Sequence, residues 1–271
     1  MSLSFYLLAA FDKNNQLSTE AGLKYFILGA FSSGLLLFGM SIIYGSTGST
    51  SYIAIRDILL FSDFSQSEHI LLGMSLVIIG LLFKLAAAPF HMWVPDVYQG
   101  APTSVTLFLS TVPKIAAVAM LVRILVDGLG AMHAYWSDLF MILAVLSIAL
   151  GSVVALMQTN IKRMLAYSTI SHVGFIMLGF VTGVVSGYGA AVFYILVYIL
   201  MSLAAFGMII LLNKKGFEAD QISDFRGLSK HSPWFALMML VTMLSMAGVP
   251  PFIGFYSKFF ILQQVISARS E

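Results

Sequence analysis

The chain has 271 residues, of which 59% are hydrophobic and 10% are charged, and its formal net charge is +2. About 25% of the residues in a soluble domain are charged, so this composition excludes an ordinary soluble protein. The basic residues form no patch suited to nucleic acid, and the absence of cysteine excludes disulfides, cysteine-ligated iron–sulfur clusters and thiolate chemistry.

Long apolar runs recur along the whole chain and indicate transmembrane helices. We therefore predict an all-α fold, a polytopic membrane bundle that forms a single domain over residues 1–271. The apolar stretch at 1–11 is shorter than the roughly 20 residues that a span needs, so we interpret it as the end of a helix. Spans are predicted at about 23–44, 70–97, 103–127, 136–157, 161–185, 188–212 and 234–267.

The basic residues between these spans indicate the orientation. One side of the membrane receives Lys13, Lys24, Lys162, Arg163, Lys214, Lys215, Arg226 and Lys230, and the other receives Arg56, Arg123 and Arg269. The larger group is expected in the cytoplasm, because positively charged loops are retained there.

Two of the spans are interrupted. Pro89 breaks the span at 70–97, and the sequence GVPPFIGF at 248–255 breaks the span at 234–267. These spans are an odd number of crossings apart, so they cross the membrane in opposite directions. Two broken helices of opposite orientation predict inverted repeats, with the transport site at the breaks.

Three lysines, Lys84, Lys114 and Lys258, lie inside the apolar spans. Each costs roughly 2.5–3.5 kcal/mol at the membrane centre, so an intramembrane lysine is by default a functional candidate. The alternative is that the side chain extends to the headgroups, which fits Lys258 better than Lys114 in the middle of its span. Burial disfavours the charged ammonium, so these lysines are suited to binding and releasing protons.

The histidines offer little support for a metal or haem site, because no two of them share i, i+4 spacing. His91, just after the break at Pro89, could relay protons near neutral pH or be a packed polar residue. His172 lies among small residues, and we interpret it as a hydrogen-bonding contact between helices.

The remaining charged residues near span ends have simpler interpretations. Lys162 and Arg163 are expected only to mark the cytoplasmic boundary, and Asp96 to be a loop or cap residue. Glu20 and Lys24 are four residues apart, which predicts a surface ion pair on one helix.

The stretches FKLAAAPFHMWVPDVYQGAPTSVTLFLSTVPKIA, NIKRMLAYSTISHVGF and MAGVPPFIGFYSKF carry a resemblance to a known family. The chain resembles the N-type, antiporter-like membrane subunits of respiratory complex I, NADH:quinone oxidoreductase. The phrase PDVYQGAP distinguishes these subunits from M- and L-type relatives and from subunits of cation/proton antiporters and membrane hydrogenases.

The resemblance implies a subunit of fourteen helices, of which this chain would be a fragment lacking the first four to five and the last two. Lys84, Lys114 and Lys258 match the family lysines of helices seven, eight and twelve, where helices seven and twelve are broken. His91 matches the histidine of its PFH motif, and Lys24 a secondary lysine. These residues would form the proton path.

The resemblance also implies a non-redox subunit with no catalytic centre, which pumps protons while NADH reduces quinone. NADH, FMN, iron–sulfur clusters and quinone would belong to other subunits. The expected partners are other membrane-arm subunits and the lipid bilayer, without nucleic acid, in the bacterial cytoplasmic (inner) membrane as a multi-pass protein. The alternatives are a subunit of a multisubunit Na⁺/H⁺ antiporter or membrane hydrogenase, and a scaffold in which all three lysines could become methionine harmlessly.

Overall fold

A computed structural model describes residues 2–61, 68–213 and 218–270. Regular structure in these ranges is helical, apart from one isolated bridge between Asn160 and Gln221. Six of the described helical stretches are long and apolar enough to cross a membrane. The protein is therefore an all-α, multi-pass membrane bundle, as its composition predicts.

The helices follow one another with short connections. Their bounds are α1 Ser2–Ala9, α2 Gln16–Thr47, α3 Tyr52–Phe61, α4 Glu68–Leu85, α5 Trp93–Gly100, α6 Thr103–Leu121, the π-helix η2 Val122–Gly128, the 3₁₀ turn η3 Gly130–Met132, α7 His133–Leu156, α8 Ile161–Val181, α9 Val185–Leu212, the 3₁₀ turn η4 Ile222–Phe225, α10 Leu228–His231, α11 Pro233–Ala247 and α12 Ile253–Ser270.

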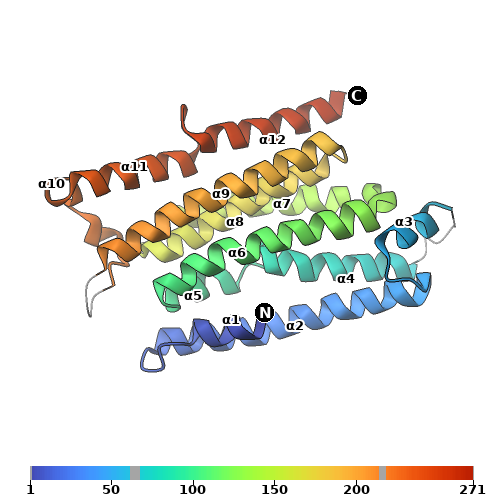
Figure 1. Cartoon of the computed structure of the whole chain (residues 1–271), viewed down its shortest axis with the longest axis horizontal. Helices are drawn as coiled ribbons and strands as arrows, with labels where there is room; N and C mark the ends of the chain where they lie inside the picture. Colours follow the sequence, from blue (N-terminus) through green and yellow to red (C-terminus); the bar gives the residue numbers. More distant parts are fainter. Residues whose placement is uncertain (1, 62–67, 214–217, 271) are drawn as a thin grey trace.

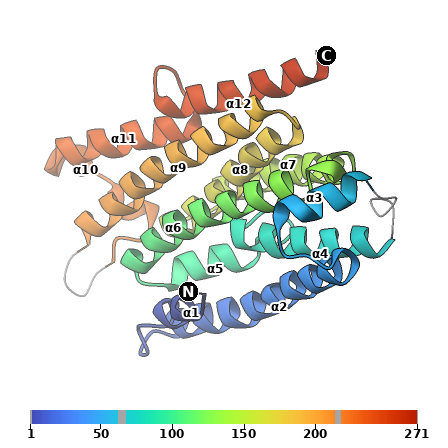
Figure 2. The same ribbon diagram turned by 45° about the vertical axis from the view of Figure 1, so that its right-hand side comes forward.

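The long helices lie side by side, with α1 and α2 on one side, α11 and α12 on the other, and α4 to α9 between them (Figures 1 and 2). The helix α8 lies in the interior, and most of its length is buried. The half-helix pairs α4–α5 and α11–α12 run in opposite directions (Figure 1), as the odd spacing of the broken spans predicts. An inverted repeat relating the two halves stays a prediction.

Hydropathy located the apolar part of α2 but missed its beginning. The helix starts at Gln16 rather than near residue 23, because the side chain of Asn15 accepts a hydrogen bond from the Leu17 amide and caps the first turn. Polar residues at the start of a capped helix are helical without being buried in lipid. The apolar span is thus shorter than the helix that contains it.

The first break begins earlier than Pro89. The helix α4 ends at Leu85, because Ala86 adopts a left-handed conformation with φ of 69°. The Ala86 amide then bonds the Phe83 carbonyl, and the Ala87 amide bonds the Leu82 carbonyl. This pattern is a Schellman cap, which usually takes glycine at the left-handed position, so the proline was the more visible signal.

Small residues bring α7 and α8 into close contact. A Cβ atom added to Gly174 would lie 2.7 Å from the Ala144 carbonyl oxygen and 2.7 Å from Ile148 Cγ1. Only glycine fits this approach, because the carbonyl oxygen belongs to a helix backbone and cannot move aside alone. The close packing holds α8, which carries His172, against its neighbours.

Candidate functional site

Lys114 caps the end of the first broken helix. In the Schellman cap of α4, the carbonyls of Lys84 and Leu85 are the ones left without amide partners from the turn. Lys114 reaches across from α6, and its Nζ donates to the Leu85 oxygen at 2.7 Å and to the Lys84 oxygen at 3.4 Å. The side chain is 1% exposed, so it does not extend to the headgroups.

Lys258 does the same at the second broken helix. Gly248 is left-handed with φ of 84°, and the amides of Gly248 and Val249 bond the carbonyls of Ser245 and Leu244. The carbonyls of Met246 and Ala247 remain, and Lys258 Nζ donates to each of them at 3.0 Å. The half-buried side chain therefore turns inward to the break rather than outward to the headgroups.

The two breaks thus share one arrangement, in which an ammonium bonds the last two carbonyls of a half-helix. The carboxyl end of a helix carries a partial negative charge, which stabilises a nearby cation. Burial has the opposite effect, because a low-dielectric environment disfavours the charged form. An ammonium held between these opposing effects is suited to exchanging a proton when the surrounding charge changes.

Lys84 does not make such a cap. Its side chain lines a cavity of about 190 Å³ between α1, α2, α4 and α6. Trp93, whose ring stacks with those of Tyr25 and Phe83, lines the same cavity, and its indole donates to the Phe83 carbonyl at 3.0 Å. Lys114 Nζ lies 5.4 Å from the Trp93 ring centre. Trp93 is therefore near Lys114 and shares a cavity with Lys84.

His91 belongs to this first site. It lies in the link between α4 and α5, and its Nδ1 atom is buried without a hydrogen bond in the described structure. The backbone of the link is held from α7, because the Ala88 amide donates to the Ser147 hydroxyl at 2.9 Å. Lys84 therefore lies in the last turn before the first break, Lys114 bonds the end of that helix, and His91 lies in the link that follows it.

His172 is part of the second site, which its interpretation as a helix contact did not include. Its Nδ1 lies 2.7 Å from the Tyr194 hydroxyl, so it does hydrogen-bond between α8 and α9. It is also close enough to Lys258 for an electrostatic interaction, and Lys258 lies 5.3 Å from the Phe175 ring centre on the same helix. The signal available in the sequence was the polar row Tyr194, Tyr198 and Ser202 at intervals of four.

Lys24 lies apart from the buried lysines, at the end of the bundle where α5 ends. It pairs with Glu20 at 2.6 Å, as predicted, and also with Asp96 at 2.6 Å. Asp96 lies within α5, whose N-cap is Met92, and it also pairs with Arg163 at 2.7 Å, so the expectation that it is a loop or cap residue is wrong. One carboxylate thus joins α2, α5 and α8 through two ion pairs.

The interpretation of Lys162 and Arg163 as boundary markers alone is also wrong. Lys162 is 2% exposed, and its Nζ donates to the Ala101 carbonyl at 3.2 Å and to Glu218 at 3.0 Å. Of the cytoplasmic group predicted from the loops, Lys214 and Lys215 lie outside the described residues. The described lysines that pair with acids, Lys24 and Lys162, lie at the same end of the bundle.

We expect Asp96→Asn to lower the stability of the assembled protein by about 1–2 kcal/mol. Hydrogen bonds to charged groups contribute roughly 1.5–3 kcal/mol, and partial exposure of this network reduces that value. The midpoint of thermal denaturation of the solubilised complex measures the change. The matched control is Asp57→Asn, which removes an exposed pair with Arg56 and should shift the midpoint little. Equal shifts in the two variants would contradict the role of Asp96.

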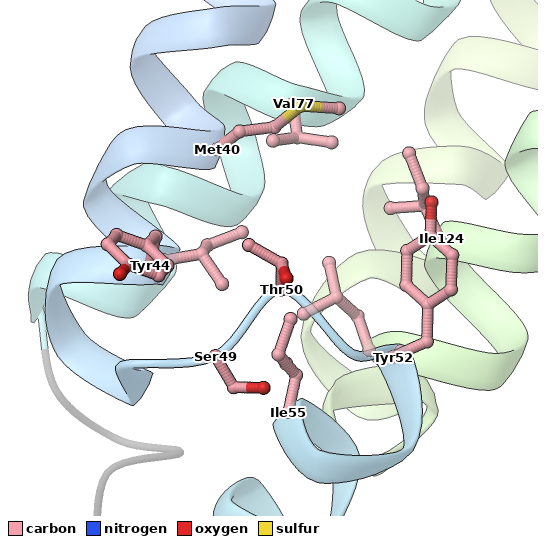
Figure 3. Close-up of a pocket in the computed structure, with 11 residues that line it drawn as sticks. Met40, Tyr44, Ser49, Thr50, Tyr52, Ile55, Val77 and Ile124 are labelled. Carbon is pink, nitrogen blue, oxygen red and sulfur yellow. The ribbon is translucent and has the colours of Figure 1, made fainter.

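A separate apolar cavity of about 160 Å³ lies beside α3 (Figure 3), and α3 is at the end of the bundle opposite α5 (Figure 1). It is formed between α2, α3, α4 and η2, and Met40, Tyr44, Ile55 and Ile124 line it. None of its lining residues is charged. This cavity therefore has no proton carrier and is separate from the lysine sites.

Within the described ranges, no group of three or more His, Asp or Glu side chains is placed to hold a metal ion. The polar chemistry of the two breaks consists of amines, imidazoles, hydroxyls and backbone carbonyls. These groups are suited to binding and moving protons.

Comparison with known proteins gives consistent matches. NADH-quinone oxidoreductase subunit N of Ruthia magnifica subsp. Calyptogena magnifica is 71% identical over 270 residues, which is 99% of this chain and 56% of the relative. Respiratory complex I from Thermus thermophilus with bound aureothin contains a chain that is 36% identical, with a TM-score of 0.81 over 98% of this chain and 56% of that one. A chain of the archaeal membrane-bound sulfane sulfur reductase is 29% identical, with a TM-score of 0.86 over 99% and 57%.

The chain thus spans little more than half the length of the relatives it matches. The family described as NADH:quinone oxidoreductase/Mrp antiporter, TM, matches residues 1–270. Since this match covers nearly the whole chain, with the two broken helices and Lys84, Lys114 and Lys258, the chain belongs to the NADH:quinone oxidoreductase/Mrp antiporter transmembrane family.

Proposed function

We propose that the chain is part of an N-type subunit of complex I and moves protons across the bacterial cytoplasmic membrane. The movement would be coupled to NADH oxidation and quinone reduction in other subunits, which would hold FMN and the iron–sulfur clusters. The 71% identity to a relative named NADH-quinone oxidoreductase subunit N supports this assignment. Other membrane-arm subunits and lipid would surround the chain, and further helices on either side of this segment stay a prediction.

The observation that carries the proposal is the shared cap at the two broken helices. Lys114 and Lys258 each bond two helix-end carbonyls from inside the bundle. One such cap alone would also be explained by a lysine with a purely structural role. Two lysines in the same arrangement at breaks of opposite orientation (Figure 1) support a transport role, since broken helices supply ion sites in transporters.

Proton transfer would depend on two opposing effects at each cap, the attraction of the helix end for a cation and the cost of burying that cation. The ammonium donates to both carbonyls, whereas a neutral amine has one donor fewer and carries no charge to match the helix end. A proton arriving at Lys84 would repel the proton held by Lys114, because like charges in a buried site interact strongly. His91 could accept that proton in the link, and Lys24 would serve the end of the bundle that faces the cytoplasm.

The main alternative is a subunit of an Na⁺/H⁺ antiporter or a membrane hydrogenase, since the chain of the sulfane sulfur reductase has a similar fold. The native complex should be purified through a tag on this subunit and inserted into liposomes. We expect the complex to reduce quinone when NADH is added. We also expect this reaction to acidify the liposome interior without any requirement for Na⁺. Na⁺ flux without NADH oxidation would favour the antiporter. Unchanged proton transport after all three lysines become methionine would leave only a scaffold role.

A further inference from the structure

The helices α8 and α9 bury a row of polar side chains between them. Positions seven and ten residues apart lie on one face of a helix, as do positions four and eight apart. The row consists of Lys162, Thr169 and His172 on α8 and of Tyr194, Tyr198 and Ser202 on α9, each at most 3% exposed. Because α9 runs antiparallel to α8 (Figure 2), the two sets face each other along one line.

The middle of the row is hydrogen-bonded. The Thr169 hydroxyl donates to the Leu165 carbonyl at 2.8 Å, so the Tyr198 hydroxyl is the donor in its 2.9 Å bond to Thr169. The His172 ring lies 5.3 Å from the Tyr198 ring, between centroids, and bonds the Tyr194 hydroxyl. His172 shares α8 with Phe175, whose ring centre lies 5.3 Å from Lys258 Nζ. One end of the row therefore reaches the second broken helix.

Two more hydroxyls lie beside this pair without completing a hydrogen bond. The Tyr98 hydroxyl on α5 lies near Thr169 and Tyr198, and the Ser202 hydroxyl lies near Tyr198. Both oxygens are buried, and neither makes a hydrogen bond of good geometry within the described residues. A buried hydroxyl without a well-aligned partner is uncommon, so these two oxygens are available to complete or exchange a hydrogen bond with the Thr169–Tyr198 pair.

The other end of the row reaches a polar pocket. Tyr98 lies one helical turn before Ala101. The Ala101 carbonyl accepts a hydrogen bond from the buried Lys162 ammonium. Lys162 also lines a pocket of about 460 Å³, together with Asp12, Gln99, Glu218 and Asp220. The Glu218 side chain is 49% exposed, so the pocket connects with the surroundings at the end of the bundle that holds Lys24.

We propose that Tyr98, Thr169 and Tyr198 form a second proton route, which leads from the polar pocket at Lys162 to His172 and Lys258. The route is separate from the site of Lys84 and Lys114 at the first break, and it rests on the proposed proton transport. Each hydroxyl would accept one proton and release another, so no group is oxidised or left charged after a passage. Rotation of the Tyr98 and Tyr198 hydroxyls would restore the starting bonds.

The test compares variants that remove a hydroxyl and keep the side-chain shape, in the full complex in inverted membrane vesicles. Tyr198→Phe and Thr169→Val should each lower the protons taken up per NADH oxidised several-fold, at equal subunit content by immunoblot. Thr169→Ser retains the hydroxyl and should retain the ratio. Tyr188→Phe, on the same helix but outside the row, is the matched control. The double variant Tyr198→Phe/Thr169→Val should be no worse than the lower single variant, because the groups act in series.

Normal ratios in Tyr198→Phe and Thr169→Val, with a lowered ratio in Lys114→Ala, would overturn the second route and leave the proposed function standing. An equal loss in Thr169→Val and Thr169→Ser would also overturn it, since the hydroxyl would not be the active group. Normal transport in Lys114→Ala, Lys84→Arg and the hydroxyl variants together would reject the proposed function. If Tyr198→Phe does not assemble, the comparison of Thr169→Val with Thr169→Ser decides.

Discussion

Lys114→Ala is expected to lower proton pumping by about two orders of magnitude when it is made in the subunit within its complex. A positioned acid–base group contributes typically about 10²–10⁴-fold to a proton transfer, and Lys114 is the fully buried lysine at the first break. The carbonyls of Lys84 and Leu85 would also lose their donor. Proton uptake by inverted vesicles, driven by NADH, measures the effect, and coupled NADH:quinone activity should fall with it.

The structural role of Lys114 requires its own control. Lys114→Arg keeps a cation and donors for the two carbonyls, but arginine does not release its proton. If both variants assemble and neither pumps, proton release is the essential property. Recovery of pumping in Lys114→Arg would show that Lys114 acts as a helix cap alone. If Lys114→Ala pumps protons at the native rate and with the native amount of assembled complex, Lys114 is not part of the proton path.

Lys84→Arg should also abolish most pumping, although the charge is conserved. Lys84 lies at a cavity of about 190 Å³ next to Trp93, so a larger cation has room without a change of the fold. Arginine stays protonated at every physiological pH, and the site would then carry a permanent charge. We expect the protons moved per NADH oxidised to fall by about a hundredfold, the smaller end of the range for acid–base groups.

The control for Lys84→Arg is Lys230→Arg, at an exposed position in α10, which should pump at the native rate. The same vesicles and the same immunoblot normalisation serve both variants. If Lys84→Arg pumps at the native rate, a fixed charge is sufficient at this position. The proton-carrier role of Lys84 would then be wrong, whereas the role of Lys114 would be unaffected.

The sequence alone determined the class of protein and identified the candidate residues of its site. A low content of charged residues and long apolar runs require helices that satisfy their own backbone hydrogen bonds in lipid. Prolines mark helix breaks because they lack an amide hydrogen, and a lysine far from either span end is expensive enough to be noticed. These signals are local, so Lys84, Lys114 and Lys258 could be identified without knowledge of the helix arrangement.

Only the tertiary structure decided what these side chains contact. Lys114 bonds carbonyls about thirty positions earlier in the chain, and Asp96 joins Lys24 to Arg163 across three helices. Such contacts depend on how helices lie relative to one another, which neither periodicity nor hydropathy encodes. The sequence predicted that Lys162 is a boundary residue, because its neighbours in sequence are polar. The packing of α5 against α8 nevertheless buries its side chain.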